Sequence, residues 1–306
     1  MKLSMVFFGT SEFAVPALRK LVASNFQITA VITQPDKPAG RKQLPLPSPV
    51  KKWAQENDVK VLQPHKLTTD SLQLTADVFI VASYGKIIPK AVLDIPQYGT
   101  LNIHPSLLPK YRGPSPIQTA ILNQDRETGV TIIKLDEEMD HGPIIVSKKW
   151  KIENSTTYEK LHDKLAELGA DLLIETLPEY IRGEIKPVAQ DHNKVTFTKI
   201  ITKQDGRIDW KKTAEEIDAQ IRAFHVWPVA WTTLDGKRLK IYDASIIPSP
   251  TSERVKGEVT DASGTIKIQT GNGVLSIKEL QLEGGKRLTA QEFINGQSGL
   301  ERKILL

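Results

Sequence analysis

The chain has 306 residues, a length that favours two domains, and its 40% hydrophobic and 25% charged residues are typical of a globular protein. It contains no cysteine, which excludes disulfides, thiolate metal sites and cysteine nucleophiles and fits a cytoplasmic protein. No apolar run approaches the roughly 18 residues of a membrane span, and a net charge of +5 is a weak indication of a polyanionic partner.

Strand-like and helix-like segments alternate through residues 1–185. The pattern predicts a buried first strand at Lys2–Phe8 and a helix at Ser11–Ala23. Further strands are expected at Ile28–Ile32, Val59–Leu62, Val78–Ala82, Thr100–Ile103, Val130–Leu135 and Ile144–Lys149. Strands that alternate with helices indicate an α/β domain with a mostly parallel sheet, covered on both faces.

A basic, proline-rich segment covers residues 37–52. Its basic residues are Lys37, Arg41, Lys42, Lys51 and Lys52, and it contains no acidic residue. Prolines at 38, 45 and 47 disfavour regular structure before Pro49, which is expected to start a helix. On charge alone the segment is a solvated surface loop, although such a loop can also neutralise phosphates.

Three polar side chains at predicted strand ends form the strongest chemical pattern in the chain. Asn102 and His104 lie two residues apart and so share one face of their strand, and Asp140 follows the next strand. An amide and an imidazole can hold a carbonyl oxygen that becomes negative, and a carboxylate can orient the ring or hold a proton-relay water. The trio contains no side-chain nucleophile, so it predicts direct transfer of a small carbonyl group to an amine.

Each member of this trio also has a simpler interpretation. His104, beside a proline-rich turn, can be a hydrogen-bonded structural residue, while Asn102 and Asp140 can be turn formers. A metal site made by His104, Asp140 and His141 is a third interpretation, although the spacing resembles no helix-borne metal motif. The residues alone leave these alternatives open.

The second half of the chain has a different character. A long helix is predicted at Thr157–Leu177, followed by an aperiodic connector. After a short helix at Thr213–Phe224, short strands are separated by turn signals at Asp235-Gly236, 261–264 and 271–273, which predicts a small β-barrel. We therefore expect domains at 1–189 and 206–306, joined by a linker at 190–205.

The string Asn102-Ile-His104-Pro-Ser-Leu-Leu-Pro109 resembles the core motif of the folate-dependent formyltransferases. Segments 7–14, 34–41 and 111–118 resemble the members of this family that act on methionyl initiator tRNA, as do segments 207–210 and 221–228 of the second domain. The resemblance covers essentially the whole chain. It implies a Rossmann-like formyl-transfer domain followed by a small OB-like barrel that binds tRNA.

The resemblance also implies roles for single residues and for partners. The catalytic residues would be Asn102, His104 and Asp140, acting on 10-formyltetrahydrofolate as donor without a metal. The residues that bind this folate would be Tyr84, Gly85, Ile87, Ser106, Leu107, Leu108, Pro109 and Gly142. Lys37, Arg41 and Lys42 would contact methionyl initiator tRNA, and Phe13 would either line a pocket for the methionine side chain or belong to the core. A monomer is expected, with no membrane contact.

Some features leave the assignment open in detail. The family often has Asp-Thr-Gly where this chain has Asp140-His141-Gly142, and His141 is either neutral or alters the folate loop or the pH profile. Family members that formylate a small amine, glycinamide ribonucleotide or an amino-sugar nucleotide, are one rival. A non-catalytic RNA-binding protein is another, which the intact trio disfavours. The basic residues that could contact RNA in the second domain, or be plain surface charge, are Lys237, Arg238, Lys240, Lys286 and Arg287.

Overall fold

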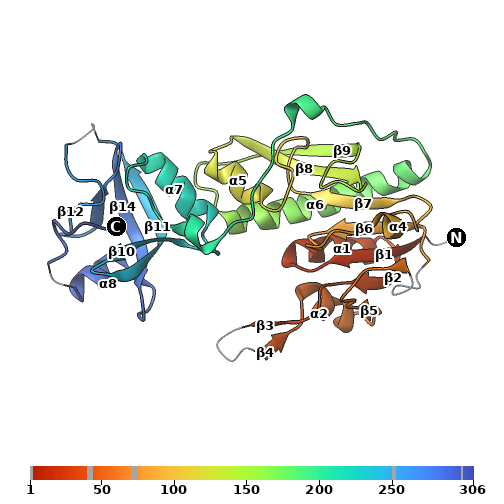
Figure 1. Cartoon of the computed structure of the whole chain (residues 1–306), viewed down its shortest axis with the longest axis horizontal. Helices are drawn as coiled ribbons and strands as arrows, with labels where there is room; N and C mark the ends of the chain where they lie inside the picture. The colour runs from red at the N-terminus through yellow and green to blue at the C-terminus, as the bar shows by residue number, and fades with distance from the viewer. Residues whose placement is uncertain (1–2, 40–43, 70–74, 250–252, 298) are drawn as a thin grey trace. The chain divides into compact units, whose positions relative to one another are not determined.

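The computed structural model describes residues 3–39, 44–69, 75–249, 253–297 and 299–306, which form two compact units (Figure 1). The first unit comprises Met1–Pro116, Glu127–Lys151 and His162–Lys199. The second unit comprises Ile117–Arg126, Ile152–Leu161 and Ile200–Leu306. The domain limits expected from the sequence, with a linker at 190–205, stay a prediction.

The first unit is built on a seven-stranded sheet in the described residues, with strand order β5-β2-β1-β6-β7-β8-β9. The strands are β1 (Ser4–Gly9), β2 (Gln27–Ile32), β5 (Val61–Leu62), β6 (Val78–Ala82), β7 (Thr100–His104), β8 (Glu127–Lys134) and β9 (Ile144–Lys151). The first five strands in this order, β5, β2, β1, β6 and β7, run parallel to one another. Strand β8 pairs antiparallel with both β7 and β9. The predicted α/β class with a mostly parallel sheet is confirmed.

Burial explains where each strand lies in the sheet. Every residue of β6 is buried, as expected for a central parallel strand, whereas the residues of β9 alternate between more and less exposed positions, as expected for an antiparallel edge. Among the residues described for this unit, the α-helices are α1 (Val15–Ala23), preceded by the 3₁₀ turn η1 (Glu12–Ala14), α2 (Pro49–Glu56), α4 (Lys90–Leu93) and α6 (Tyr158–Ile181), whose first turn belongs to the second unit.

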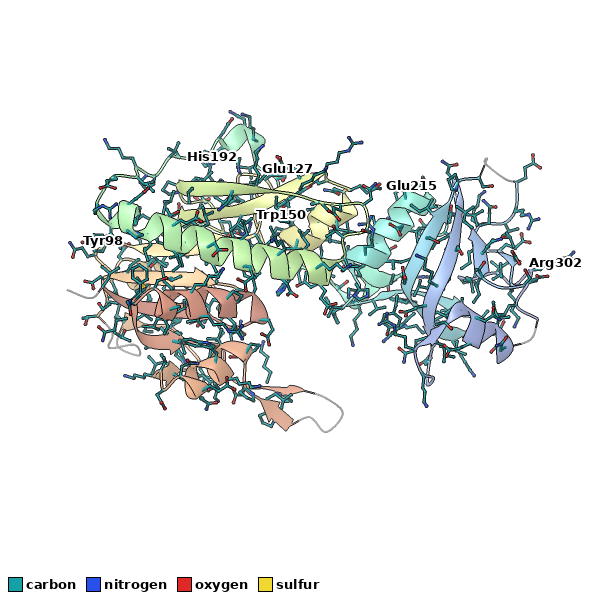
Figure 2. The ribbon with its side chains drawn as sticks, turned by 180° about the vertical axis from the view of Figure 1, so that it is seen from behind. Tyr98, Glu127, Trp150, His192, Glu215 and Arg302 are labelled. Atoms are coloured by element: carbon teal, nitrogen blue, oxygen red, sulfur yellow. The ribbon has the colours of Figure 1, made fainter. Side chains whose placement is uncertain are left out.

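Helix α6 packs closely on the strands that carry the polar trio. A Cβ atom at Gly169 would lie 2.5 Å from Ile103 Cγ2 on β7, so only glycine permits this approach. Nearer the start of the helix, Lys164 Nζ lies 4.4 Å from the ring centre of Trp150 on β9, a residue that Figure 2 labels. The helix thus fixes β7, the strand that ends at His104, against the body of the unit.

The proline-rich segment forms regular structure, so the expectation of an irregular loop was wrong. Strands β3 (Lys37–Ala39) and β4 (Leu44–Leu46) pair antiparallel as a short ribbon that extends away from α2 and β5 (Figure 1). Pro38 lies opposite Pro45. This must be a non-hydrogen-bonded pair, because in such a pair neither residue donates a backbone N–H to the other, and proline has none. The helix expected at Pro49 does begin there, capped by the Ser48 hydroxyl, which accepts from Lys51 N at 3.1 Å.

The second unit contains a curled antiparallel sheet, consistent with the predicted small OB-like domain. In the described residues its order is β10-β11-β14-β13-β12, with β15 beside β14. The strands are β10 (Ala230–Leu234), β11 (Lys237–Ile247), β12 (Val259–Asp261), β13 (Ile266–Gln269), β14 (Val274–Leu282) and β15 (Leu288–Thr289). Its helical segments are α5 (Pro116–Leu122), η3 (Lys203–Gly206), α7 (Ala214–Ala223) and α8 (Ala290–Asn295), while η2 (His192–Lys194) belongs to the first unit.

The turn and cap chemistry of the second unit follows its sequence closely. Asp235 and Gly236 have φ angles of 51° and 76°, the left-handed pair of a two-residue hairpin turn, and they join β10 to β11 as predicted. Helix α7 begins with a capping box in which Thr213 and Glu216 exchange side-chain to backbone hydrogen bonds of 2.8 and 3.2 Å. Ile217 and Ile221 on this helix join the same apolar core as Ile241 and Leu275 of the sheet.

Candidate active site

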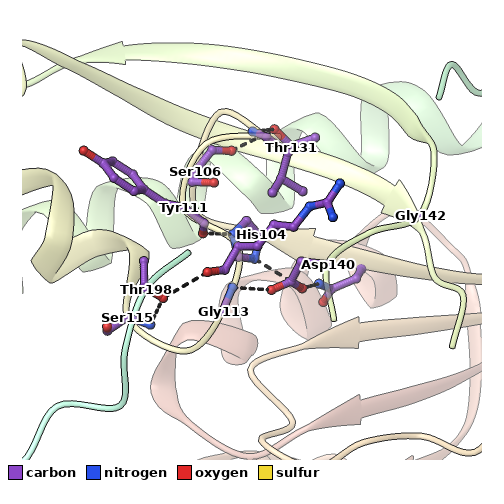
Figure 3. Close-up of polar contacts among 12 residues, drawn as sticks. His104, Ser106, Tyr111, Gly113, Ser115, Thr131, Asp140, Gly142 and Thr198 are labelled. Carbon is purple, nitrogen blue, oxygen red and sulfur yellow. Dashed lines mark hydrogen bonds and ion pairs between the residues drawn. The ribbon is translucent and has the colours of Figure 1, made fainter. Parts of the chain in front are cut away.

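The structure brings the amide, the ring and the carboxylate of the predicted trio together. Asn102 Nδ2 lies 3.5 Å from Asp140 Oδ1, and His104 Nδ1 lies 3.6 Å from the same oxygen (Figure 3). Asn102 and His104 come from the end of β7, and Asp140 comes from the loop between β8 and β9. The His104 ring is almost fully buried, so its polar contacts are weakly screened by water.

The far side of the His104 ring is held by the backbone. Nε2 lies 2.9 Å from the carbonyl oxygen of Tyr111, and because a carbonyl oxygen only accepts, Nε2 carries the hydrogen. Nδ1 is therefore the nitrogen that faces Asp140, free of a hydrogen when the ring is neutral and carrying one when the ring is charged. This tautomer depends on a tertiary contact that the sequence did not indicate.

The Asp140 carboxylate is held in a similar way. Its Oδ2 accepts a hydrogen bond of 2.8 Å from the backbone N–H of Gly113, which leaves Oδ1 for Asn102 and His104. The backbone of Asp140 has φ 50°, a left-handed conformation that is uncommon outside glycine but that aspartate adopts more readily than most residues. This backbone sets the direction in which the carboxylate leaves the loop.

Gly142, a predicted folate-binding residue, lies where the loop after β8 passes very close to Lys134 at the end of that strand. A Cβ atom there would lie 1.8 Å from the carbonyl oxygen of Lys134, so no other residue fits. The glycine therefore sets the path of the loop that carries Asp140. Its predicted contact with folate stays a prediction.

Sequence reasoning missed two buried residues that join the loops of the site. Gln190 Nε2 donates to the carbonyl oxygens of Asp140 and Gly142 at 2.9 and 2.8 Å. Gln190 Oε1 accepts from Arg112 Nε and Nη2 at 3.1 and 2.8 Å. Gln190 lies in the segment read as a linker, where no local pattern marks it, and only the tertiary structure reveals the contact.

The Tyr111–Ser115 loop is also fixed by a neighbouring segment. Arg112 N donates to Thr196 O at 2.9 Å, and Thr198 N donates to Arg112 O at 2.8 Å. The Thr196 hydroxyl accepts from Tyr111 N, and the Thr198 hydroxyl accepts from Ser115 N (Figure 3). The backbone groups that bind His104 and Asp140, Tyr111 O and Gly113 N–H, are thus fixed by hydrogen bonds between residues 196–198 and their loop.

The predicted folate loop directly follows His104. Ser106 is buried and its hydroxyl donates to Lys110 O at 2.6 Å, while Leu108, also buried, donates its N–H to the Thr131 hydroxyl at 3.1 Å. Leu107 packs beside Gly129 and Pro109 is partly exposed. These hydrogen bonds hold the loop against β8, and its role in folate binding stays a prediction.

A second predicted folate segment follows β6. The Tyr84 ring is buried against Phe8, with centroids 5.5 Å apart, and burial raises the pKa of its hydroxyl, which finds no hydrogen-bond partner among the described residues. Gly85 has φ 75°, and Ile87 is 79% exposed. An exposed Ile87 is suited to contact an apolar ligand surface, whereas Tyr84 belongs to the core.

The predicted substrate-binding residues lie in different surroundings. Phe13 is buried, with its ring edge-on to His162 at 5.5 Å. Lys37 is exposed on β3, and Arg41 and Lys42 lie outside the described residues. At the base of this ribbon Lys51 Nζ lies 2.6 Å from Asp36 Oδ2, so Lys51 is engaged within the protein.

His141 turns to partners of its own instead of joining the trio. Its Nδ1 lies 2.6 Å from Asp136 Oδ2, and its ring stacks on His192 of η2, labelled in Figure 2, with centroids 4.8 Å apart. Within the described ranges, no group of three His, Cys, Asp or Glu side chains is arranged to hold a metal ion.

One face of the second unit combines cations and aromatic rings. The Arg238 guanidinium lies 4.3 Å from the ring centre of Trp231, and that of Arg287 lies 4.2 Å from the ring centre of Tyr242. Strand alternation places Arg238, Lys240 and Tyr242 on one side of β11 while Leu239 and Ile241 enter the core. We call Trp231, Arg238, Lys240, Tyr242 and Arg287 the basic aromatic face; Lys237 and Lys286 are exposed beside it.

Two family models match the chain. The model described as "Formyl transferase" matches residues 1–177, and that described as "Formyl transferase, C-terminal domain" matches residues 200–298. Among the described residues, no helix is long and apolar enough to span a membrane.

Curated relatives match over nearly the full length. The methionyl-tRNA formyltransferase of Methylococcus capsulatus is 42% identical over 299 residues, covering 96% of this chain and 97% of the relative. The enzyme of the same name from Bacillus velezensis is 40% identical over 301 residues, covering 96% and 95%.

A solved structure shares the fold. A sugar 3N-formyl transferase, WlaRD, crystallised with dTDP and 5-N-formyl-THF, superposes with a TM-score of 0.69 at 24% identity, covering 94% of this chain and 100% of that one. This likeness concerns the fold alone. On the family models and the full-length relatives, the chain belongs to the formyltransferase family, in the group of the methionyl-tRNA formyltransferases.

Proposed function

We propose that the protein transfers the formyl group of 10-formyltetrahydrofolate to the α-amino group of methionyl initiator tRNA, giving N-formylmethionyl-tRNA for translation initiation. The observation that carries the proposal is the convergence of Asn102, His104 and Asp140 on one point. Full-length similarity to methionyl-tRNA formyltransferases supports the choice of acceptor. We also infer a cytoplasmic monomer, which would give a mass of 34.1 kDa by light scattering.

Asn102 and His104 serve as the donors for the formyl oxygen. As the amine adds to the formyl carbon, this oxygen becomes negative and needs hydrogen bonds that are already in place. Asn102 offers its Nδ2–H, and protonated His104 offers its Nδ1–H, since Nε2 is bound to Tyr111 O. One donor of this kind is worth about 2.7–4 kcal/mol of transition-state stabilisation.

Asp140 stabilises the charge on His104 and assists the proton transfers. Its Oδ1 faces the ring nitrogen at 3.6 Å, a gap that admits attraction without a direct hydrogen bond. The amine attacks in its neutral form and then loses a proton, which Oδ1 or a water bound to it can accept. Because Oδ2 is held by Gly113 N, the carboxylate keeps this orientation throughout.

The site fits a formyl-folate donor. The donor supplies an activated formamide, whose carbonyl needs two hydrogen bonds. When the tetrahedral intermediate collapses, the bond between the formyl carbon and the folate nitrogen breaks without need of a metal, and this nitrogen leaves as tetrahydrofolate with the proton that Asp140 or its water took from the amine. The residues that would bind its remainder are Gly85 and Ile87, the Ser106–Pro109 loop and Gly142, while the buried Tyr84 ring would support this surface from the core. The exposed Ile87 gives this surface an apolar contact.

Two exposed basic regions are assigned to the tRNA. The ribbon that carries Lys37, with Arg41 and Lys42 next to it in the chain, would approach the acceptor stem. The basic aromatic face of the second unit would follow the phosphate backbone, with cations to pair phosphates and rings to stack bases.

A comparison of acceptors tests the proposal. Purified protein and labelled formyl-folate would be given methionyl initiator tRNA, glycinamide ribonucleotide or a dTDP-linked amino sugar, and the labelled product measured. Transfer to the tRNA at least about 10³-fold faster in kcat/KM, corresponding to roughly 4 kcal/mol, is expected. If a small amine is formylated faster than the tRNA, that amine is the acceptor and the proposed acceptor is wrong. If the protein binds tRNA but transfers no formyl group to any of the three acceptors, it is a non-catalytic RNA-binding protein.

A further inference from the structure

Gln190 is a buried amide that spans the two loops of the active site and has no assigned part in the reaction. We propose that Gln190 is a positioning residue for formyl transfer, which holds Asp140 and, through Arg112, the groups that orient His104. The proposal rests on the proposed function only for the identity of the amine acceptor.

The contacts of Gln190 use the whole of its amide. Both Nε2 hydrogens are donated, one to Asp140 O and one to Gly142 O, while Oε1 accepts two hydrogen bonds from Arg112. Flipping the amide would set Oε1 against two carbonyl oxygens and Nε2 against a guanidinium. The orientation is therefore fixed by chemistry. The side chain is 4% exposed, so water cannot replace these bonds at low cost.

On one side, the contact acts on the loop that carries Asp140. The two accepting carbonyls belong to the residues on either side of His141, so one amide holds the backbone of Asp140 and that of Gly142. Asp140 has a left-handed backbone, a conformation that aspartate tolerates better than most residues and that hydrogen bonds from its surroundings support. The bonds from Gln190 are part of those surroundings, and the direction of the Asp140 carboxylate depends on them.

On the other side, the contact reaches the His104 ring through Arg112. The two neighbours of Arg112 are the groups that hold the catalytic side chains: Tyr111 O binds His104 Nε2, and Gly113 N–H binds Asp140 Oδ2. One amide thus ties together the two backbone segments on which the relative position of ring and carboxylate depends. Misplacement of reacting groups by about 1 Å can cost on the order of 10²-fold in rate.

The donor half of this contact occurs also in the second unit, away from the catalytic residues, and it supplies a control for the loss of the two donors. The Oε1 atom of Gln220 is buried and has no hydrogen-bond partner among the described residues, unlike that of Gln190. Gln220 is 6% exposed, and its Nε2 donates to Asp205 O at 2.8 Å and to Arg207 O at 3.0 Å. There too the two carbonyls belong to residues two apart in the chain. Because Gln190 also accepts from the buried Arg112, the two variants need not lose the same stability, and the comparison is made on kcat and its pH dependence. A purely structural role for Gln190 predicts that the two variants do not differ in these.

The experiment compares Gln190→Met with Gln220→Met, two changes that keep the side-chain length and remove both donors. Melting temperature, kcat, KM for methionyl-tRNA and for formyl-folate, and the pH dependence of kcat would be measured for each. We expect both variants to melt at lower temperature. Gln190→Met should lose about 10–100-fold in kcat, with an altered pH profile and KM for tRNA within about twofold. Gln220→Met should retain kcat and the pH profile of the parent.

Equal kcat losses in the two variants, or an unchanged kcat in folded Gln190→Met, would overturn the proposal. If Gln190→Met fails to fold, Gln190→Asn keeps the amide one methylene farther back and should show the same kcat loss against Gln220→Asn. If the parent protein formylates a different amine, the same comparison is run with that amine. Failure of the acceptor assignment is thereby distinguished from failure of the positioning role.

Discussion

The candidate active site of the first unit and the basic aromatic face of the second unit are built in opposite ways. His104 is buried, and both its nitrogens and both Asp140 oxygens have defined neighbours. Arg238 and Arg287 instead lie at the surface, each against an aromatic ring. Catalysis at a single carbonyl group requires hydrogen-bond donors that are aimed at its oxygen, whereas attraction of a polyanion requires only positive charge in the right area. Losses at the first region should therefore appear in kcat, and losses at the second in KM and salt dependence.

The largest effect is expected from His104→Ala. The variant loses the donor for the formyl oxygen, so kcat should fall about 10²–10⁴-fold, with KM for tRNA nearly unchanged. Steady-state kinetics with methionyl-tRNA would measure both constants, with His65→Ala, at an exposed histidine, as the control. An unchanged kcat would show that His104 takes no part in the mechanism. A large rise in KM with kcat unchanged would contradict the expectation that losses at the candidate active site appear in kcat.

A smaller effect is expected from the double variant Arg238→Ala, Lys240→Ala. Loss of two phosphate contacts should weaken tRNA binding about tenfold at physiological salt and reduce the slope of log affinity against log salt by about 2. The kcat at saturating tRNA should not change. The double variant Lys267→Ala, Arg302→Ala removes the same charge elsewhere in the unit (Arg302 is labelled in Figure 2) and should leave the slope as it is.

Arg41→Ala should have an effect of the same kind but smaller. Loss of one phosphate contact is expected to weaken tRNA binding about fivefold and to lower the salt slope by about 1, with no change in KM for formyl-folate. Lys52→Ala, on the first turns of α2, is the matched charge loss. If Arg41→Ala impaired folate binding, the ribbon would belong to the chemical region and not to the region that recognises RNA.

The smallest effect is expected at the base of the ribbon. The Lys51 ammonium, which donates to the Asp36 carboxylate, lowers the pKa of Asp36, and Gln63 adds to this. A lowered carboxyl pKa makes the contact fully present above the usual value of about 3.9, and it is lost only as the pH falls further. The ratio of KM for tRNA between Asp36→Asn and the parent should thus stay within about twofold and be constant from pH 6 to 9. A ratio that varies across this range would contradict the assigned charge state.

Much of the fold could be predicted from the sequence because its signals are local. The apolar run of β6, the Asp235-Gly236 turn and the proline at the start of α2 each depend on neighbours in the chain. The position of Asn102 and His104 toward the carboxyl end of a central strand could also be predicted, since ligands of such sheets bind beyond these ends. The rule does not place Asp140, because β8 runs antiparallel to β7 and ends beside Leu101, so Asp140 reaches the site only through the loop that follows β8. Their catalytic roles stay predictions that the kinetic variants test.

What could not be predicted depends on contacts between distant segments. Gln190 meets Asp140 across 50 positions of sequence, and no periodicity marks that meeting. The Tyr111 carbonyl that selects the tautomer of His104 is a backbone atom, invisible to any reading of side chains. The ribbon departs from its prediction for a different reason: a proline removes a ladder donor at most positions of a strand, but two prolines that face each other in a non-hydrogen-bonded pair leave the ladder complete.

The facing prolines of this ribbon have a further consequence. A two-stranded ribbon has two outer edges, and at its non-hydrogen-bonded pair the backbone N–H groups point outward, where another strand would add. Pro38 and Pro45 occupy that pair, so neither edge presents a donor there. The ribbon can therefore project into solvent beside other copies of itself without pairing with them in a growing sheet, as the tRNA contact proposed for it requires.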